Sequence, residues 1–588
     1  MLDAGGQYCH LIARKVRDLG VYAEVRPSDT PAAELKGSKG IIISGGPSSV
    51  YEPSSPRIDP AILNPAQGAG VMGICYGQQI IAHELGGVVR KGDRGEYGLA
   101  HLQRLRPHPL FDGVTFDGTN GDGTNGDSQI WMNHRDLVQS VPDGFDVLAS
   151  TETIDVAAMG HRDRPIVAVQ FHPEVAHTRQ GRRILSNFIF NICGCTRDWD
   201  PKDRIPAIEE QIRRAVGDDN VFFFVSGGVD STVAFTLCLR ALGAQRVYGT
   251  YVDTGLMRAG ETAYVTSLFH NIGATAWHVE DAKEEFLSAL AGVCDPEQKR
   301  HIIGEQFVAV QERVLQTGHF LEGNWMLGQG TIYPDTIESG GTAKSDVIKT
   351  HHNRVAGIQK LIDAGRIVEP LTSFYKDEVR EIGAELGIPA KFLHRHPFPG
   401  PGLAIRCLCS SDENPLERRP EGWLLPIRSV GVQGDSRSYR SVLALETFPP
   451  GDEATALVNR IGDINRVVAL AGSKTPLSEL RVTRGYLSEE RLARLRFCDH
   501  IVRRRTEDSG FDQQVWQLPV VLIPLGSTAA PDSIVLRPID SVDGMTAQVV
   551  RMPDDLLQSI TAELLNVPGI SAVFFDLTHK PPGTIEWE

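Results

Sequence analysis

Short apolar runs alternate with glycine-rich turns and helical stretches over the first third of the chain. Three of these runs contain almost no charge and predict strands buried on both faces: Gly40–Ser44, Gly70–Ile74 and Ile166–Phe171. Buried strands separated by helical segments are typical of a doubly wound α/β domain with a parallel sheet, which we place at residues 1–195. Because Met1 stands almost against the first loop, we expect the first strand to be short or truncated.

The same pattern returns after a charged, proline-containing segment at residues 196–205, which we interpret as a linker. Val221–Val225 and Val247–Val252 predict two further buried strands, and Met326–Leu327 lead into a third loop. These elements favour a second doubly wound α/β domain, which we assign to residues 203–396.

The last third changes character after the proline- and glycine-rich segment Pro397–Gly402. Valine-rich strands are expected at Val520–Ile523, Ile534–Leu536 and Val573–Phe575, with amphipathic helices between them. Strands and helices that do not alternate regularly predict an α+β domain, here residues 397–588.

Composition and charge narrow the range of expected partners and locations. The chain of 588 residues has 59 basic and 74 acidic residues, a net charge of −15, so we expect neither nucleic acid nor an anionic membrane as a partner. No run of about 18 apolar residues is present, and nine scattered cysteines are too few for a disulfide scaffold, which favours the cytosol. We expect the tandem repeat at 118–127 to be a surface insertion, and the Cys193/Cys195 and Cys407/Cys409 pairs to be packing residues.

The segment Gly73–Gly77 places Cys75 between two glycines directly after a predicted strand. A turn this tight, from strand into helix, demands unusual backbone angles, and it puts the thiol at a helix N-terminus that favours thiolate. Far downstream, His172 and Glu174 follow another strand; His172 is suited to take the thiol proton and Glu174 to hold the imidazole. Taken alone, the Cys75 motif is equally consistent with a buried thiol, and the motif of His172 and Glu174 is a weaker signal still. Together the two motifs predict a catalytic triad.

This set of residues resembles the triad of class I glutamine amidotransferases. The resemblance implies an oxyanion loop at Ser44–Ser48, with the backbone amides of Gly46 and Tyr76 stabilising the oxyanion, and a place for Gln79 at the rim of the glutamine pocket. One departure is visible: the Ser-His-Gly-Asp segment of the family stands here as Asn133–Asp136, with arginine replacing the glycine. We expect this change to affect the cap of the glutamine pocket and to leave the triad intact.

A second glycine-rich loop follows the strand Val221–Val225 and opens a helix. Its amides and hydroxyls are suited to cradle phosphate, but it lacks the lysine of a Walker A loop, and a generic turn is the alternative. It resembles the pyrophosphatase loop of enzymes with an adenine-nucleotide α-hydrolase-like fold, which cleave ATP between the α- and β-phosphates. The resemblance implies Mg²⁺ at Asp230 and a phosphate contact from Lys349 in a lid. The ATP-binding residues it implies are Ser226, Gly227, Gly228, Val229, Asp230, Ser231 and Thr232.

Three segments of the last third resemble signatures of glutamine-hydrolysing GMP synthetases: Arg395–Arg406, Gly431–Tyr439 and Asp576–Glu588. The resemblance covers nearly the whole chain, and the long last domain is more like that of the eukaryotic-type enzyme. It implies ATP-driven adenylation of the C2 oxygen of xanthosine monophosphate (XMP), with pyrophosphate released. Ammonia from glutamine, carried internally, then displaces AMP to give GMP. The resemblance also implies a homodimer.

The final segment is unusual for the end of a chain, because Pro581, Pro582 and Trp587 favour a docked rather than a frayed tail. Lys580 is suited to neutralise a nucleotide phosphate and Glu586 to accept hydrogen bonds from a purine. With the contacts that the resemblance adds, the expected XMP-binding residues are Arg300, Asp435, Gln517, Lys580, Ile585 and Glu586.

Two other functions compete with this interpretation. Another AMP-forming, glutamine-dependent ligase, such as an NAD synthetase, is expected to lack a purine-binding terminus. A catalytically inactive paralogue is expected to have eroded motifs, whereas Cys75, His172, Glu174 and the loop Ser226–Ser231 are complete.

Overall fold

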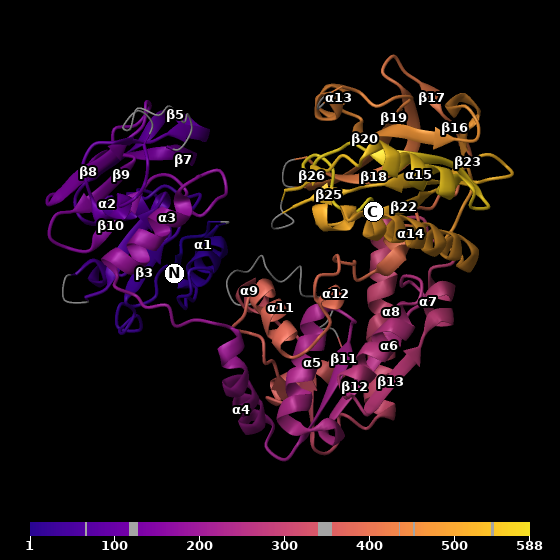
Figure 1. Cartoon of the computed structure of the whole chain (residues 1–588), viewed down its shortest axis with the longest axis horizontal. Helices are drawn as coiled ribbons and strands as arrows, with labels where there is room; N and C mark the ends of the chain where they lie inside the picture. Colours follow the sequence, from indigo (N-terminus) through magenta and orange to yellow (C-terminus); the bar gives the residue numbers. More distant parts are fainter. Residues whose placement is uncertain are drawn as a thin grey trace. The chain divides into compact units, whose positions relative to one another are not determined.

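The protein consists of two compact units, Met1–Arg204 and Ile205–Glu588 (Figure 1). The computed structural model describes residues 1–6, 8–64, 68–116, 128–338, 355–433, 436–450, 453–541 and 546–588. Three sequence predictions concern residues outside these ranges: the insertion at 118–127, Lys349 and Asp435. The second unit contains both the second and the third predicted domain.

The first unit is built on an eight-stranded sheet in the order β2-β1-β3-β4-β10-β9-β8-β6. The strands are β2 (Arg26–Pro27), β1 (Leu2–Asp3), β3 (Gly40–Ile43), β4 (Gly70–Ile74), β10 (Ile166–Val169), β9 (Ala158–His161), β8 (Phe145–Ser150) and β6 (Gln103–Arg104). β2 to β10 pair in parallel, whereas β9, β8 and β6 continue the sheet in antiparallel pairs. The predicted α/β fold and its three buried strands are therefore confirmed, and the antiparallel side is an addition.

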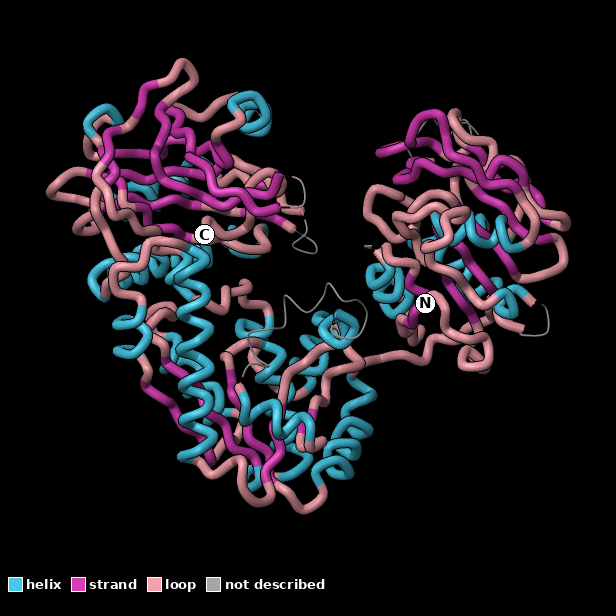
Figure 2. Tube along the Cα trace, turned by 180° about the vertical axis from the view of Figure 1, so that it is seen from behind, coloured by secondary structure: helices cyan, strands magenta, loops and turns pink. Residues whose placement is uncertain are grey.

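Helices pack against this sheet, and a separate ribbon lies beside it (Figure 2). The helices are α1 (Cys9–Arg17), α2 (Tyr76–Glu84) and α3 (Gly181–Ser186), and the ribbon pairs β5 (Val88–His101) with β7 (Gln129–Ser140). Apolar side chains of β3, β4 and β10 alternate between two core clusters, with Ile42, Met72 and Val167 in one and Ile41, Val71 and Ala168 in the other. Burial on both faces explains why these strands have near-continuous apolar sequences.

The second unit begins with a five-stranded, wholly parallel sheet in the order β13-β12-β11-β14-β15. Its strands are β13 (Ala276–Asp281), β12 (Val247–Asp253), β11 (Asn220–Val225), β14 (Trp325–Gly328) and β15 (Ile367–Val368). Its helices are α4 (Ile205–Val216), α5 (Val229–Leu242), α6 (Glu261–Asn271), α7 (Lys283–Ala289), α8 (Pro296–Thr317), α9 (Tyr333–Glu338), α10 (Ala356–Asp363), α11 (Lys376–Glu385) and α12 (Ala390–Leu393). Phe222 packs on the side of α7 and α8, and Phe223 contacts Phe235 of α5, so helices cover both faces.

The chain runs outward from β11 to β13 and then returns to β14 on the other side of β11. Ligands of open parallel sheets bind at such a switch point, outside the carboxyl ends of the strands. The glycine-rich loop after β11 lies at this position.

A seven-stranded mixed sheet follows, in the order β17-β18-β19-β20-β27-β24-β22, and confirms the α+β prediction. Its strands are β17 (Glu417–Arg418), β18 (Trp423–Gln433), β19 (Ser436–Leu445), β20 (Ile464–Ser473), β27 (Ile570–Asp576), β24 (Asp532–Leu536) and β22 (Val520–Ile523). Short strands pair separately: β16 (Asn414–Pro415), β21 (Arg481–Val482) and β23 (Leu525–Gly526), and β25 (Ile539–Asp540) with β26 (Gln548–Val549). The helices are α13 (Glu453–Ile461), α14 (Glu489–Ser509) and α15 (Asp554–Leu565).

A continuous apolar core joins the two sheets of the second unit. Phe222 and Leu327 of the parallel sheet belong to the same cluster as Leu492 of α14 and Phe575 of β27. The opposite face of the mixed sheet has its own cluster, which includes Trp587 from the tail. Shared burial of this kind explains why the two sheets form one compact unit.

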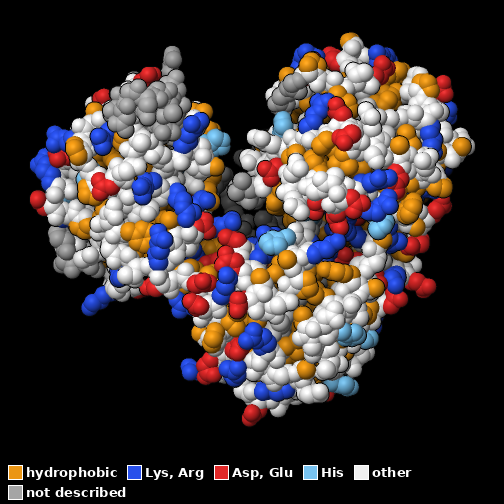
Figure 3. All heavy atoms as spheres, viewed as in Figure 1, with side chains coloured by type: hydrophobic (Ala, Val, Ile, Leu, Met, Phe, Trp, Pro, Cys, Tyr) orange, Lys and Arg blue, Asp and Glu red, His pale blue; other side chains and the backbone are white. Residues whose placement is uncertain are grey.

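No described helix is long and apolar enough to cross a membrane. On the face seen in Figure 3, acidic and basic side chains are interspersed rather than gathered by sign.

Candidate active sites

The predicted nucleophile occupies a strained turn between β4 and α2. Cys75 has φ of 54°, a left-handed value that non-glycine residues rarely adopt. A Cβ on Gly73 would lie 2.3 Å from the carbonyl oxygen of Gly77, and one on Gly77 would lie 2.3 Å from that of Ile43. Both glycines are therefore required by close backbone approach, as the sequence predicted, and the thiol stands at the first turn of α2.

The structure brings the three predicted triad residues together in the protein interior. β4 and β10 are neighbouring parallel strands, so the segments that follow them meet at one edge of the sheet. Nδ1 of His172 lies 2.7 Å from Oε1 of Glu174, and both side chains are buried, as is Cys75. A Cβ on Gly45 would lie 3.1 Å from Cε1 of His172 and 3.5 Å from Cβ of Cys75, so the imidazole and the thiol flank this glycine.

The charge state of His172 follows from its neighbours. Burial lowers the pKa of this imidazole, but the Glu174 carboxylate and the Cys75 thiol outweigh burial and raise the pKa to about 10. Nε2 is buried and has no hydrogen-bond partner among the described residues, which leaves it available for the thiol proton. A protonated imidazole beside a thiol at a helix N-terminus favours the nucleophilic thiolate.

The predicted oxyanion loop packs tightly against the end of the first strand. A Cβ on Gly46 would lie 2.4 Å from the carbonyl oxygen of Ala4, and one on Gly6 would lie 2.2 Å from that of Gly45. The hydroxyl of Ser44 accepts a hydrogen bond from the amide of Ala4 at 3.0 Å. Only glycines fit these contacts. The close packing holds the Gly45–Gly46 backbone in place, and Gly45 lies beside the predicted nucleophile.

Gln79 is buried within α2 and bound to protein groups. Its amide Nε2 donates to the carbonyl oxygen of Asp136 at 2.8 Å and to Oε1 of Gln170 at 3.3 Å. Gln79 thus ties the Asn133–Asp136 segment, whose Asn133 carbonyl lies 3.7 Å from the thiol, to α2. Oδ2 of Asp136 is buried with no hydrogen-bond partner among the described residues.

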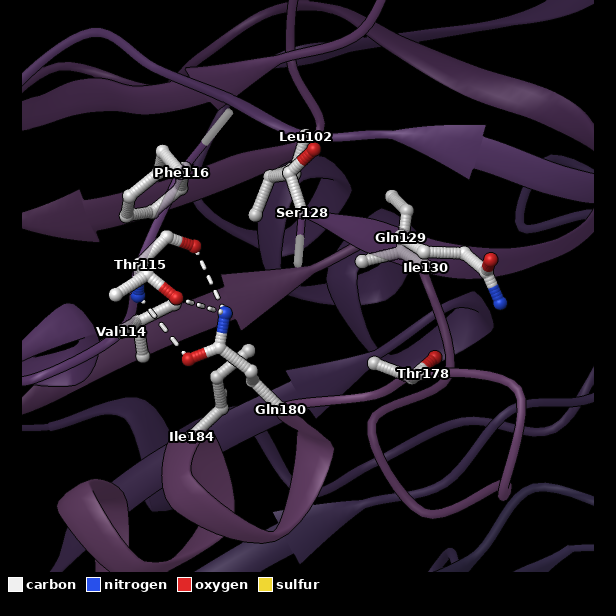
Figure 4. A pocket seen from close by; sticks show the side chains of 10 residues that line it. All are labelled: Leu102, Val114, Thr115, Phe116, Ser128, Gln129, Ile130, Thr178, Gln180 and Ile184. Carbon is white, nitrogen blue, oxygen red and sulfur yellow. Dashed lines mark hydrogen bonds between the residues drawn. The ribbon is translucent and has the colours of Figure 1, made fainter. Parts of the chain in front are cut away.

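A small apolar cavity near α3 is separate from these groups. Figure 4 shows that the side chain of Gln180, one of the lining residues, points to Thr115, with hydrogen bonds of 2.8 to 3.0 Å between the two residues. None of the residues lining it is a predicted site residue.

In the second unit, the predicted ATP loop joins β11 to α5 at the switch point of the parallel sheet. Gly227 has φ of 72°, and the amide of Gly228 donates to Oγ of Ser226 at 3.2 Å. The hydroxyls of Ser231 and Thr232 donate to the carbonyl oxygen of Gly228 at 3.1 and 2.8 Å. The loop is therefore pre-shaped, with the N-terminus of α5 directly behind it, as anion binding requires.

Asp230 stands in the first turn of α5 and is only partly satisfied. Its Oδ2 lies 2.9 Å from Nζ of Lys376, whereas Oδ1 is buried with no hydrogen-bond partner among the described residues. A free carboxylate oxygen at the predicted ATP loop fits Mg²⁺, which binds through one or two carboxylates and substrate phosphates. Lys376 is a residue that sequence reasoning missed, because nothing in the sequence places α11 beside this loop.

The tail is docked, as predicted, and its backbone is held by two buried arginines. Arg466 donates to the carbonyl oxygens of Thr584 and Glu586 at 2.9 and 2.7 Å, and Arg537 donates to those of Thr584 and Ile585 at 2.8 and 3.0 Å. Both arginines share the carboxylate of Asp576, which also accepts from Nε1 of Trp587 at 2.9 Å.

Two predicted XMP-binding residues meet on the tail. Nε2 of Gln517 lies 3.4 Å from Oε1 of Glu586 and donates to the carbonyl oxygen of Pro397 at 2.9 Å. The guanidinium of Arg406 binds the same carboxylate through Nε and Nη2, at 2.9 and 2.7 Å. Arg406 is the last residue of the Arg395–Arg406 signature. The sequence therefore identified the segment, but nothing in it indicated that this arginine contacts Glu586.

Arg300 and Lys580, two further predicted XMP contacts, lie at separate points: Arg300 on α8 beside the end of the tail, and Lys580 within the tail itself. Nη2 of Arg300 donates to the main-chain oxygen of Glu588, and the adjacent Lys299 lies 2.6 Å from the side chain of Glu588. Lys580 pairs through its main chain with Ala547. The structure therefore joins α8 to the end of the tail.

Comparison with known proteins gives two family matches. The class I glutamine amidotransferase family model matches residues 1–192, and the model of the GMP synthase C-terminal domain matches residues 504–587.

Relatives match over the full length. A probable glutamine-hydrolysing GMP synthase from Leptospira interrogans is 42% identical over 100% of this chain and 99% of its own. The glutamine-hydrolysing GMP synthase of Caldicellulosiruptor saccharolyticus is 40% identical with the same coverage, and that of Aquifex aeolicus is 37% identical over 100% of this chain and 99% of its own. These matches span the whole chain, including the segments of the predicted triad and the predicted ATP loop. The chain therefore belongs to the family of glutamine-hydrolysing GMP synthases.

Proposed function

We propose that this enzyme aminates XMP to GMP, with ATP as the activating nucleotide and glutamine as the nitrogen donor. The observation that carries the proposal is the buried Cys75–His172–Glu174 arrangement at the carboxyl edge of a parallel sheet. The preformed phosphate loop and the anchored tail support the synthetase half. The relatives named above favour this reaction over that of an NAD synthetase.

In the glutaminase half, Sγ of Cys75 attacks the side-chain amide carbon of glutamine and His172 protonates the departing ammonia. The backbone amides of Gly46 and Tyr76 stabilise the oxyanion, and water then hydrolyses the thioester to glutamate. Glu174 keeps the imidazole oriented and charged, as its 2.7 Å contact with Nδ1 permits. Gln79 acts through the Asn133–Asp136 segment, which borders the thiol.

In the synthetase half, the C2 oxygen of XMP attacks the α-phosphorus of ATP and pyrophosphate leaves. The loop from Ser226 to Thr232 binds the phosphates, and Lys349 is proposed to reach them. Asp230 would hold Mg²⁺, which would supply positive charge to neutralise the leaving pyrophosphate. Ammonia, channelled from the glutaminase, attacks C2 and expels AMP to give GMP.

The XMP site is proposed to be formed by the tail and the segments around it. Glu586 and Gln517 face the purine base, with Ile585 beside them, whereas Arg300, Asp435 and Lys580 contact the sugar and phosphate. A homodimer and a cytosolic location complete the proposal.

Omission of single substrates from a mixture of ATP, glutamine and XMP tests the proposal, with loss of XMP absorbance as the readout. Cys75→Ala should abolish glutamine-dependent synthesis and leave ammonia-dependent synthesis within about twofold, since the two chemistries use different residues. Cys195→Ala, which changes another thiol of the same unit, is the control. Equal loss of both activities in folded Cys75→Ala protein contradicts the division of labour.

A further inference from the structure

The carboxylate of Glu586 is oriented mainly by the enclosed cation of Arg406, with a longer contact of 3.4 Å from Nε2 of Gln517. Nε of Arg406 lies 2.9 Å from Oε2 of Glu586, and Nη2 lies 2.7 Å from Oε1, which is the two-point geometry of a guanidinium–carboxylate pair. The exposed fractions differ: the side chain of Arg406 is 0% exposed and that of Glu586 is 15% exposed. Part of the Glu586 side chain is therefore accessible to a ligand, while the arginine is fully enclosed.

The backbone of Glu586 is held independently of its side chain. Its carbonyl oxygen accepts from Nη2 of Arg466 at 2.7 Å. Its main chain is thus anchored to β20, and Arg406 determines only where the carboxylate points. Arg406 is itself fixed, because its carbonyl oxygen accepts from the amide of Leu522 in β22 at 2.8 Å.

An aromatic ring connects this pair to the ATP half of the unit. The guanidinium of Arg406 lies 5.2 Å from the ring centroid of Phe398, and that of Arg258 lies 4.6 Å from the same ring. Arg258 follows β12 in the parallel sheet and pairs with Asp499 of α14 at 3.4 Å. A series of side-chain contacts, from Arg258 through Phe398 and Arg406 to Glu586, therefore connects the loop after β12 to the tail.

We propose that Arg406 is a positioning residue that aims Glu586 at the ring N–H groups of the xanthine base. The inference rests on the proposed role of Glu586 in binding XMP. A xanthine ring presents N–H donors beside carbonyl acceptors, and a carboxylate with both oxygens oriented accepts from such donors while ionised. Burial lowers the pKa of Arg406, but the Glu586 carboxylate outweighs burial and raises it, so the guanidinium stays charged.

A double-mutant cycle tests this role in ammonia-dependent synthesis, which bypasses the glutaminase. Arg406→Met and Glu586→Gln should each raise KM for XMP by roughly 10- to 100-fold, since each removes a charge-assisted contact. Because Arg406 acts through Glu586, the double variant should be no more than about twofold worse than the poorer single variant. KM for ATP should stay within about twofold in all of them.

Arg406→Lys and a surface control complete the experiment. Lysine keeps the charge and loses the two-point contact, so Arg406→Lys should recover at least part of the XMP affinity lost in Arg406→Met. Arg505→Met removes a partly exposed arginine that binds Glu563 in the same unit, and it should leave KM for XMP unchanged. Thermal unfolding of each variant reports folding, and Arg406→Lys decides the case if Arg406→Met does not fold.

Three results would overturn the proposal in distinguishable ways. If the effects of Arg406→Met and Glu586→Gln multiply, Arg406 acts independently of Glu586. If folded Arg406→Met, or failing that Arg406→Lys, keeps a normal KM for XMP, the arginine is only structural. If Glu586→Gln itself leaves KM for XMP unchanged, the proposed base contact is wrong and Arg406 has no acceptor to position.

Discussion

Replacing Glu174 by glutamine removes one negative charge from the glutaminase site and almost no volume. The carboxylate lies 2.7 Å from Nδ1 of His172 and its side chain is 0% exposed, so water cannot substitute for the lost charge. With burial no longer opposed by this carboxylate, the pKa of His172 should fall, and the imidazole should be largely neutral at pH 9.

The size of the effect follows from the pKa of His172. Its rise from 6.5 to about 10 corresponds to roughly 5 kcal/mol, at about 1.36 kcal/mol for each pKa unit. This is the net effect after burial, which lowers the pKa, so Glu174 and Cys75 together supply at least this energy. If Glu174 supplies half of it, the variant should react roughly 50-fold more slowly at the thiol, because the thiolate loses its cationic partner.

The assay is alkylation of Cys75 by iodoacetamide between pH 6 and pH 9, followed by mass spectrometry of the Cys75 peptide. The rate should vary little with pH in the parent protein, whereas in Glu174→Gln it should be lower and climb steadily with pH. Glu152→Gln, an exposed carboxylate of the same unit, is the matched control. An unchanged rate and pH profile in folded Glu174→Gln would refute the argument that this carboxylate holds the imidazole charged.

Two further predictions concern the second unit. Asp230→Asn should reduce both glutamine- and ammonia-dependent pyrophosphate release by at least about 100-fold, since a metal ligand is worth several kcal/mol; ammonia-dependent activity near the parent level would contradict the assignment. Burial raises the pKa of Asp576, but Arg537 and Arg466 outweigh it and hold the pKa below its ordinary 3.8, so its contribution to stability is present at neutral pH and lost as pH falls below about 3.8. Asp576→Asn leaves both buried guanidiniums without their carboxylate and should lower the free energy of unfolding at pH 7 by about 3–5 kcal/mol. Urea denaturation measures this loss, with Asp508→Asn, at an exposed position, as the control. A loss below about 1 kcal/mol would show that the pairing is not needed.

The groups that sequence reasoning found stand directly after buried strands. Cys75, His172 and the loop beginning at Ser226 each follow an apolar run, and adjacent strands bring such loops together. Local sequence therefore carried enough information to locate them. The same applies to Trp587, because an aromatic residue in a polar tail indicates burial.

Residues that act across long separations were not predictable in this way. Lys376 meets Asp230 across 146 positions and Arg406 meets Glu586 across 180. Arginine and lysine are common on surfaces, so only packing reveals which of them are enclosed and paired. The antiparallel side of the first sheet was missed for a related reason: its strands are short or partly polar and resemble connecting loops.

The grip of Arg466 and Arg537 on the tail has an evolutionary consequence. Both arginines bind carbonyl oxygens of residues 584–586, and a carbonyl is the same whichever side chain is attached to it. The hydrogen bonds from the two arginines therefore tolerate a change of side chain at Ile585. They do not tolerate an insertion or a deletion in the segment. One inserted residue before Thr584 would offer the arginines equivalent carbonyls yet move Glu586 out of reach of Arg406. Selection should therefore conserve the length of this segment more strictly than the identity of its side chains.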